Sequence, residues 1–167
     1  RVPDSNITVV DSLSVSVGQG LIATYAAKLV NEGMHHSQIV DKINAIIKKT
    51  HLYASVKDLT YGVKGGRIPK SKKVVSDLLG IKPVLTVGND GSMKVAGVLL
   101  GSRNRVKKLI KLIMKKHNTS SLYNITIAHS DNKDEANQLV ELLKIKYQKV
   151  NNIPIFELVF PRFFFFF

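Results

Sequence analysis

Two segments of the chain carry arginines where an anion could bind. The stretch YGVKGGRIPK places Gly65, Gly66 and Arg67 together, and Arg103 and Arg105 lie two residues apart at the start of a long basic segment. A guanidinium binds a carboxylate or a phosphate through two parallel hydrogen bonds, and glycine lets a backbone turn tightly beside a ligand. These residues are therefore candidates for an anion site. The alternative for Gly65 and Gly66 is that they only end a helix.

A third segment, SVGQG, places Ser16, Gly18 and Gly20 just before a helical pattern. A dinucleotide-binding site would need this glycine pattern between a strand and a helix, with an acidic residue on a second strand. That acidic residue is missing from the sequence, because one helical pattern follows another. The segment instead predicts the N-terminus of a helix whose small residues can lie close to an anion or to another backbone.

Patterns typical of catalysis or metal binding are not found in the sequence. The chain has no cysteine, which excludes disulfides, thiolate metal sites and a catalytic thiol. Its five histidines lack the spacing of a two-histidine metal site, and no Gly-x-Ser-x-Gly segment surrounds a serine. Asp11-Ser12 and His129-Ser130-Asp131 each follow a predicted strand, where such residues usually cap the next helix. We therefore predict no catalytic residue, no metal site and no cofactor.

The 167-residue chain is strongly basic, with 25 Lys and Arg against 12 Asp and Glu and a net charge of +13. This charge predicts a negatively charged partner, or reflects a lysine-rich composition. Nucleic acid would require aromatic residues among the basic ones, or a helix-turn-helix, and neither pattern is visible. A basic nucleic-acid-binding or regulatory domain is therefore the alternative function, and nucleic acid is not the expected partner.

Hydrophobic periodicity predicts strands and helices along the whole chain. Runs rich in β-branched residues predict strands at 7–12, 51–56, 81–87, 93–100, 124–130 and 153–160. Helical spacing of apolar residues predicts helices at 21–33, 38–49, 58–64, 70–80, 102–118 and 133–147. Together these elements predict an α/β protein of the α+β type, with helices packed on a mixed, largely antiparallel sheet.

Capping and turn residues predict where several of these elements begin and end. Gly33 is expected to end the first helix, and Ser37 and Ser102 are expected to be the N-caps of the helices that follow them. The sequence NDGS at 89–92 lies between two β-rich runs and predicts a hairpin. Pro83 predicts either an edge position or the start of a strand.

The sequence shows no internal domain boundary, so residues 1–162 are expected to form one domain. The run Phe163–Phe167 would be an aggregation hazard if exposed, and it is set aside as an artefact. The chain has no membrane-spanning apolar run and no signal-peptide profile, and it starts without methionine. We therefore expect a cytoplasmic protein, and a sequence that is part of a longer chain.

Seven short motifs follow one another along the chain: VVDSLSVSVGQG (9–20), AAKLVNEG (26–33), GGRI (65–68), LLGIKPVL (78–85), DGSM (90–93), RNR (103–105) and IAHS (127–130). Each motif is weak alone, but the ordered set is specific and covers residues 7 to about 158. In order and spacing the set resembles the DegV family, the FakB-type bacterial fatty-acid-binding proteins.

The resemblance implies a carrier and not an enzyme. Members of the family have an N-terminal α/β domain and a C-terminal domain of helices on a largely antiparallel sheet. A long-chain fatty acid lies in a hydrophobic tunnel, with its carboxylate at the cleft between the domains. A partner fatty acid kinase then phosphorylates that carboxylate with ATP for phospholipid synthesis. The fatty-acid and cleft residues expected here are Arg67, Arg103, Arg105, Ser16, Gly18, Gly20, Gly65 and Gly66.

The chain departs from the family pattern at both ends. It begins just before the VVDS strand, so the N-terminal domain, with its carboxylate-binding Thr and Ser hydroxyls, is expected to be missing. The family's His-x-Gly-Pro-Gly motif is also missing, and PRFFFFF stands in its place. Residues 1–162 are therefore expected to be the acyl-tunnel domain alone.

Three further expectations follow from this assignment. The sheet face left bare by the missing domain could let two copies of the chain form a homodimer. The basic helix at 102–118 could contact the kinase or an anionic membrane surface. The alternative for Arg67 is an ordinary salt bridge to Asp58 or Asp77.

Overall fold

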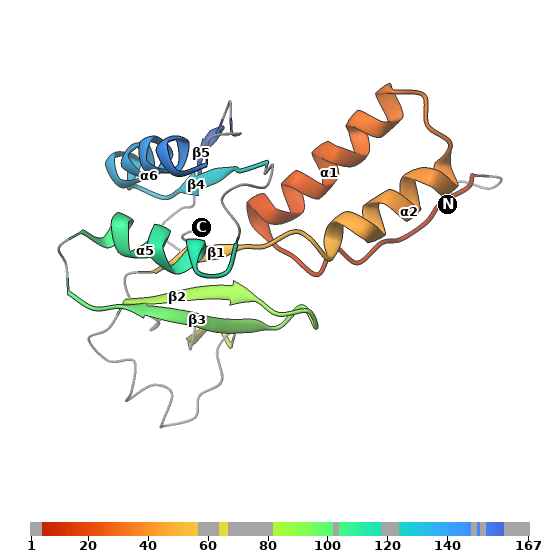
Figure 1. Ribbon diagram of the computed structural model, residues 1–167. Helices are drawn as coiled ribbons and strands as arrows, with labels where there is room; N and C mark the ends of the chain where they lie inside the picture. The colour runs from red at the N-terminus through yellow and green to blue at the C-terminus, as the bar shows by residue number, and fades with distance from the viewer. Residues whose placement is uncertain are drawn as a thin grey trace.

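The structure is a computed structural model that describes residues 5–56, 64–66, 82–101, 104–117, 124–147, 150 and 153–158. Its helices are α1 (Ser16–Asn31), α2 (His36–Ile47), α5 (Arg105–Met114) and α6 (Lys133–Lys146). Its strands are β1 (Tyr53–Ser55), β2 (Lys82–Val87), β3 (Met93–Leu99), β4 (Ile127–His129) and β5 (Ile155–Glu157). Figure 1 shows α1 and α2 side by side, extending away from the two sheets and from α5 and α6.

The helix α1 ends as the sequence predicts. Gly33 has a φ of 75°, in the left-handed region that glycine adopts without a steric penalty. Its N–H donates to the carbonyl of Val30 (2.9 Å), and the N–H of Met34 donates to the carbonyl of Leu29 (3.1 Å). This pair of hydrogen bonds is the Schellman motif, which satisfies the last carbonyls of a helix. The helix begins at Ser16, five residues earlier than predicted.

The helix α2 begins one residue before Ser37, so the prediction of Ser37 as N-cap is wrong. The N-cap is His35, with extended backbone, and its N–H donates to Oε1 of Gln38 at 3.4 Å. Because a side chain three residues ahead satisfies this N–H, Ser37 lies inside the first turn. The predicted apolar stripe of the helix is half-buried, at Ile39, Ile43, Ile46 and Ile47.

The first sheet is antiparallel, in the order β1-β2-β3. The predicted hairpin joins β2 and β3, with Gly91 at a φ of 75° and the N–H of Gly88 donating to the carbonyl of Ser92 at 2.8 Å. Pro83 is the second residue of β2, so the strand-start prediction is confirmed, whereas β2 itself is the central strand. The Pro83 carbonyl accepts a hydrogen bond from Val56 at 3.3 Å.

The second sheet pairs β4 with β5 in parallel, with Ile127 opposite Ile155 and His129 opposite Glu157. The helix α6 lies between these strands in sequence and makes the crossover that a parallel pair requires. The sequence predicts alternating burial for this segment, but all three residues of β4 are buried. Continuous burial is usual for strands that are covered on both faces. The α+β class, with helices on antiparallel and parallel strand pairs, is confirmed.

The helix α5 begins later than predicted. Gly101 (φ 72°) and Asn104 (φ 59°) both have left-handed backbone, so helical geometry starts only at Arg105. The N-cap is therefore Asn104, and the prediction of Ser102 is wrong. The predicted apolar stripe is confirmed, because Val106, Leu109 and Ile110 are buried and Ile113 is half-buried.

The strand predicted at 7–12 is wrong. These residues have no regular structure, and the side chains of Ile7 and Val9 are 66% and 92% exposed. A strand needs a partner for its backbone hydrogen bonds, and no described strand pairs with this segment. The carboxylate of Asp11 instead accepts the N–H of Leu13 at 2.9 Å, which forms a local turn.

The helices predicted at 58–64 and 70–80 fall mostly outside the described residues, as do Arg67, Ser102, Arg103 and the run Phe163–Phe167. Lys64 is helical, and Gly66 has a φ of 72°. This backbone conformation agrees with the expected helix stop at Gly65 and Gly66. None of the described helices has the length and hydrophobicity needed to cross a membrane.

Among the described residues, α5 contributes to two apolar clusters of the core. Ile110 packs in the cluster around α6, β4 and β5, while Leu109 packs with Val84 and Leu99 of the first sheet. Figure 1 shows α5 between the β2–β3 hairpin and the layer of α6 and β4. The first cluster consists of Ile110, Ile127, Ala136, Val140, Leu143, Tyr147, Val150 and Ile153.

Two glycines of α1 differ in their surroundings, which predicts opposite effects of substitution. A Cβ at Gly18 would meet Oγ of Ser14 and lie 3.7 Å from Cδ1 of Leu52, whereas a Cβ at Gly20 would meet nothing within 4 Å. We expect Gly18→Val to lower the free energy of unfolding by about 1–3 kcal/mol through overpacking. Gly20→Ala should raise it by roughly 0.5–1 kcal/mol, because alanine favours the helix. Urea unfolding of both variants checks this, and equal effects would contradict the packing role of Gly18.

Candidate functional site

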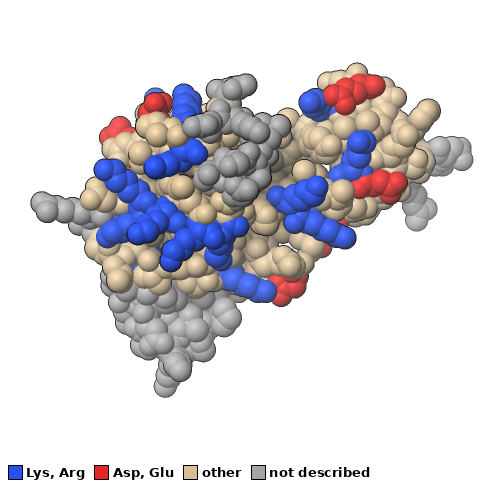
Figure 2. All heavy atoms as spheres, viewed as in Figure 1, with Lys and Arg blue, Asp and Glu red and all other residues tan. Residues whose placement is uncertain are grey.

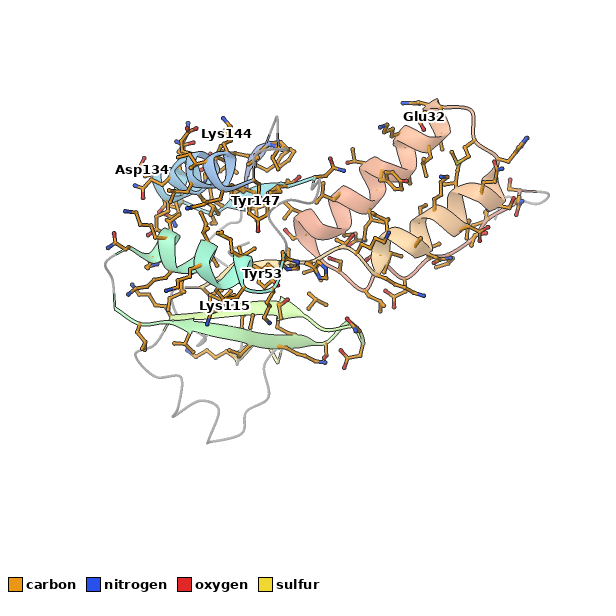
Figure 3. All side chains as sticks on the ribbon, in the orientation of Figure 1. Glu32, Tyr53, Lys115, Asp134, Lys144 and Tyr147 are labelled. Carbon is orange, nitrogen blue, oxygen red and sulfur yellow. The ribbon has the colours of Figure 1, made fainter. Side chains whose placement is uncertain are left out.

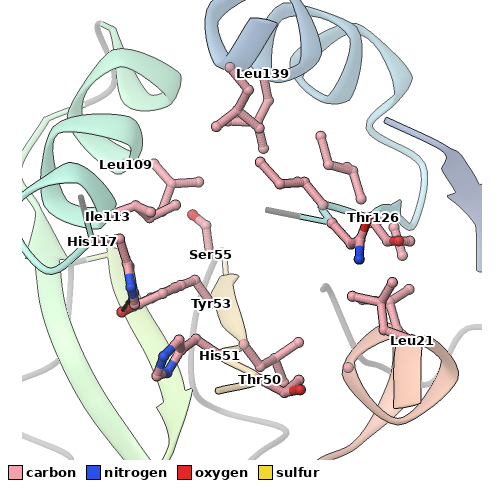
Figure 4. A pocket seen from close by; sticks show the side chains of 18 of the residues that line it. Leu21, Thr50, His51, Tyr53, Ser55, Leu109, Ile113, His117, Thr126 and Leu139 are labelled. Carbon is pink, nitrogen blue, oxygen red and sulfur yellow. Dashed lines mark hydrogen bonds between the residues drawn. The ribbon is translucent and has the colours of Figure 1, made fainter. Parts of the chain in front are cut away.

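A cavity of about 780 Å³ lies between α1, β1, α5 and α6. This volume is within the usual range for small-molecule sites. Figure 4 shows Leu109 and Ile113 of α5 on one side of it, and Leu139 of α6 and Leu21 of α1 on the other sides. The apolar lining also includes Ile22, Leu52, Leu99, Val106, Ile125, Ile127 and Leu143.

One end of the cavity carries an ion pair between α5 and α6. The guanidinium of Arg105 lies 3.1 Å from Oε2 of Glu135, and their side chains are 12% and 35% exposed. The amide of Asn132 donates to the same carboxylate oxygen at 2.9 Å. Because Glu135 accepts from both groups, the positive charge of Arg105 is already compensated in this structure.

Three polar atoms are buried in the wall of the cavity without a hydrogen-bond partner among the described residues. They are Oγ of Ser55, Nε of Arg105 and Nδ1 of His129. A buried polar atom left unpaired costs about 1–3 kcal/mol, so such atoms in a native fold need an explanation. Their position around one cavity indicates a site that receives a polar group.

A second polar group lies where β1 approaches the end of α5. The hydroxyl of Tyr53 and Nε2 of His117 are 2.8 Å apart and share a hydrogen bond. The rings of His51 and His117 have their centroids 4.5 Å apart. Figure 4 shows the three side chains together on one side of the pocket. Lys48, Lys49 and Thr50 continue the lining beside them.

Burial shifts the ionisation of this cluster. Burial lowers the pKa of His51, and burial together with the charges of His51 and Lys116 lowers the pKa of His117. Burial also raises the pKa of the Tyr53 hydroxyl, and Tyr147 adds to the rise. Figure 3 labels both side chains: Tyr53 belongs to β1 and Tyr147 follows α6, and both line the cavity. These pKa shifts favour the neutral forms of His51, His117 and Tyr53.

The outer surface near the cavity is basic. Figure 2 shows Lys and Arg side chains gathered over α5 on the face in view. The exposed lysines of this helix and its end are Lys107, Lys108, Lys111, Lys115 and Lys116. This arrangement places a positive surface outside an apolar interior.

The structure brings together only part of the predicted site. Arg105 and Gly18 line the cavity, with Gly18 buried against Ser14 and Leu52. Ser16 and Gly20 lie in the same helix but do not line it, and Gly20 faces open space.

Gly65 and Gly66 are exposed and do not belong to the described lining either. Arg67 and Arg103 lie outside the described residues, so their predicted role stays a prediction.

Sequence reasoning missed the histidine and tyrosine cluster. Tyr53 and His117 are 64 residues apart, and neither belongs to a spacing motif. The available signal was weak, since His51 begins a predicted strand and His117 ends a predicted helix. Among the residues that the structure describes, no three His, Asp or Glu side chains form a group that could hold a metal ion.

The Arg105–Glu135 ion pair predicts a measurable coupling. Glu135→Leu should lower the free energy of unfolding by about 1–3 kcal/mol, because it leaves the guanidinium of Arg105 without its carboxylate. Arg105→Met/Glu135→Leu should recover most of that loss, since it removes both charges. Urea unfolding checks both. The exposed pair Lys144–Glu141 (3.5 Å) provides the control, and Glu141→Leu should change stability by less than about 1 kcal/mol. A double variant no more stable than Glu135→Leu would contradict the coupling.

Comparison with known sequences assigns the chain to a family. A family model described as "Uncharacterised protein, DegV family" matches residues 1–159. A DegV domain-containing protein of Clostridium perfringens is 31% identical over 147 residues, which is 88% of this chain and 50% of the relative. One from Staphylococcus aureus is 30% identical over 155 residues, 93% of this chain and 55% of the relative. The chain thus spans about half the length of the curated relatives it matches.

Solved structures agree with this assignment. A fatty-acid-binding DegV family protein from Streptococcus agalactiae has a TM-score of 0.79 at 31% identity, covering 93% of this chain and 54% of that one. A DegV family protein from Eubacterium eligens, loaded with heptadecanoic acid, has a TM-score of 0.79 at 25% identity. The match covers 93% of this chain and 55% of that one. The fatty acid kinase B3 protein of Streptococcus pneumoniae, loaded with linoleic acid, also has a TM-score of 0.79 at 25% identity. The match covers 93% of this chain and 54% of that one. Because a family model matches residues 1–159 of this chain and the chain shares its fold with these structures, it belongs to the DegV family.

Proposed function

We propose that this chain binds a long-chain fatty acid, with the acyl chain in the cavity between α1, α5 and α6. The observation that carries the proposal is the cavity itself, which is about 780 Å³ in volume and apolar along most of its wall. The fatty acids bound by the Streptococcus agalactiae and Eubacterium eligens proteins support it, because their folds are similar to this one.

The physical basis of such binding is the transfer of methylene groups out of water. Each buried CH₂ contributes about 0.8 kcal/mol, so a long acyl chain needs only a continuous apolar wall and a few polar groups at one end. Leu21, Leu109, Ile113 and Leu139 come from three helices and supply that wall. No cofactor is required, and the fatty acid itself is the ligand.

We further propose that the chain is a carrier, which presents the bound carboxylate to a fatty acid kinase. The similarity to the fatty acid kinase B3 protein of Streptococcus pneumoniae supports this partner. The exposed lysines of α5 support it too, since a basic face attracts an acidic partner surface. In this proposal the kinase performs the phosphoryl transfer and the chain only binds and positions the acid.

Arg67 and Arg103 are retained in the proposal as cleft residues near the carboxylate. Their support is the match of GGRI and RNR to the family pattern, because both residues lie outside the described part of the chain. Arg105, the third arginine predicted at the cleft, lines the cavity and forms an ion pair with Glu135.

The proposed acyl site can be tested by filling the cavity. Leu21→Trp places an indole in the lining, and we expect it to lower the amount of co-purified long-chain acid at least several-fold, because the ring takes the space of the acyl chain. The measurement is native mass spectrometry with lipid extraction. Ala23→Trp is the control, since Ala23 is exposed on the same helix. Equal lipid content in both variants and the unmodified chain would contradict this placement.

The proposed kinase contact can be tested by charge reversal. Lys107→Glu/Lys111→Glu should slow acyl-phosphate formation in a reconstituted assay with the kinase, because two exposed cations of α5 become anions. Lys42→Glu/Lys133→Glu makes the same change of net charge on other exposed sites and should leave the rate unchanged. If reversal on α5 abolished vesicle binding with no change in kinase rate, the face would belong to an anionic membrane instead.

A further inference from the structure

The end of the cavity at the start of α5 is polar but carries a compensated charge. The guanidinium of Arg105 lies 3.1 Å from Oε2 of Glu135, and that oxygen also accepts a hydrogen bond from Asn132. Glu135 is the only carboxylate among the described lining residues. A second carboxylate placed here would be repelled by Glu135 and would compete with it for the same cation. This end therefore favours a neutral polar group over an anion.

Three polar atoms of the wall have no hydrogen-bond partner among the residues that the structure describes. They are Nε of Arg105, Nδ1 of His129 and Oγ of Ser55, and all three residues line the cavity. The exposed fraction of His129 is only 6%, so water from outside does not reach its ring freely. Because buried polar atoms in native folds are almost always paired, these three atoms indicate a polar group that occupies the cavity.

His129 and Arg105 belong to the same end of the cavity. His129 is the last residue of β4, and Asn132 follows it by three residues. Asn132 donates to the carboxylate of Glu135, which pairs with Arg105. The parallel pairing of β4 with β5 fixes the backbone of His129. The ring nitrogen and the guanidinium are thus held by different elements around one ion pair.

Ser55 approaches the same end from the first sheet. It is the last residue of β1 and lies opposite Val84 of β2. Val84 packs against Leu109, which lies about one turn after Arg105 on α5. Figure 4 shows Ser55 pointing from β1 into the space between Leu109 of α5 and Leu139 of α6. Strands and helices, rather than loops, therefore position all three unpaired atoms.

The three atoms together match a hydroxyl group. Nε of an arginine can only donate, a serine hydroxyl donates and accepts, and an imidazole nitrogen does one or the other according to its protonation. A ligand hydroxyl has two lone pairs and one O–H. It can accept from Arg105 and Ser55 while it donates to His129. A methylene group at the same place would leave all three atoms unpaired.

We propose that this end of the cavity is a subsite for a hydroxyl group on the acyl chain, and that the protein binds hydroxylated long-chain fatty acids in preference to unsubstituted ones. The inference rests on the proposed fatty-acid function and narrows its ligand class. It concerns the hydrocarbon part of the ligand and leaves the carboxylate at the cleft proposed for Arg67 and Arg103.

The sign of the preference distinguishes this subsite from a purely apolar wall. A hydroxyl that enters an apolar cavity loses its hydrogen bonds to water and gains none, so the hydroxylated acid would bind more weakly than the plain acid. In a site with unpaired donors and acceptors the hydroxyl regains those bonds, and the plain acid leaves the protein atoms unpaired. The hydroxylated acid then binds more tightly.

The test is a competition measured by native mass spectrometry on the 167-residue chain. Octadecanoic acid is mixed in equal amounts with a hydroxyoctadecanoic acid that carries its hydroxyl near the carboxylate, at mid-chain or near the methyl end. We expect at least one of these three acids to exceed octadecanoic acid in occupancy by about tenfold or more, as one or two buried hydrogen bonds would give.

Single variants assign the preference to the named atoms. In Ser55→Ala and in His129→Leu the occupancy ratio should fall several-fold, because each removes one partner of the ligand hydroxyl. Since both acids compete for the same protein, a general loss of affinity cancels from the ratio. Ser37→Ala makes the same chemical change at an exposed serine of α2, and its ratio should equal that of the unmodified chain.

Each other outcome overturns a defined part of the proposal. Octadecanoic acid that binds as well as all three hydroxylated acids, or better, would overturn the subsite and leave ordered water as the partner of these atoms. A preference that persists in both variants would overturn the assignment to Ser55 and His129. Failure of the unmodified chain to bind any of the four acids would overturn the proposed fatty-acid function itself, and the subsite with it.

Discussion

One short helix, α5, is buried on two sides at once. Its Ile110 packs in the cluster of α6, β4 and β5, and its Leu109 packs against Val84 and Leu99 of the first sheet. An isolated pair of strands is marginally stable at best, and a small sheet needs a hydrophobic face or a helix packed against it. Leu139 of α6 also packs against both clusters. Because α5 covers both sheets, it sets the distance between them, and the cavity occupies the space that its side chains and those of α1 and α6 leave unfilled.

The charges of the cavity follow the rule that a buried ion needs a partner. Arg105, with only 12% of its side chain exposed, is paired with Glu135 and supported by Asn132. Lys48 and Lys49 are exposed, so water stabilises their charge when no ligand is bound. Burial lowers the pKa of His51 and His117, which favours their neutral forms. The cavity thus combines an apolar wall and a paired arginine with exposed lysines at Lys48 and Lys49. This combination suits an amphiphilic ligand.

The predictable part of the fold was the part determined by neighbours in sequence. Gly33 ended its helix as predicted, because a left-handed C′ residue depends only on the local backbone. The NDGS turn joined β2 to β3 for the same reason. By contrast, Ser37 was displaced as N-cap by His35, where the Gln38 side chain satisfies the backbone N–H. The β-branched residues at 7–12 had strand propensity but no described partner strand.

The amino-acid sequence by itself determined the family and the α+β class, and it pointed to Arg105, which lines the cavity, because ordered motifs and periodicity are properties of the chain alone. It could not show that Arg105 is paired with Glu135, since the two come from different helices. Nor could it bring His51, Tyr53 and His117 together, because no local pattern links a strand to the end of a helix more than sixty residues away. Only tertiary packing decides which polar groups share an apolar cavity, and which of them keep an uncompensated charge there.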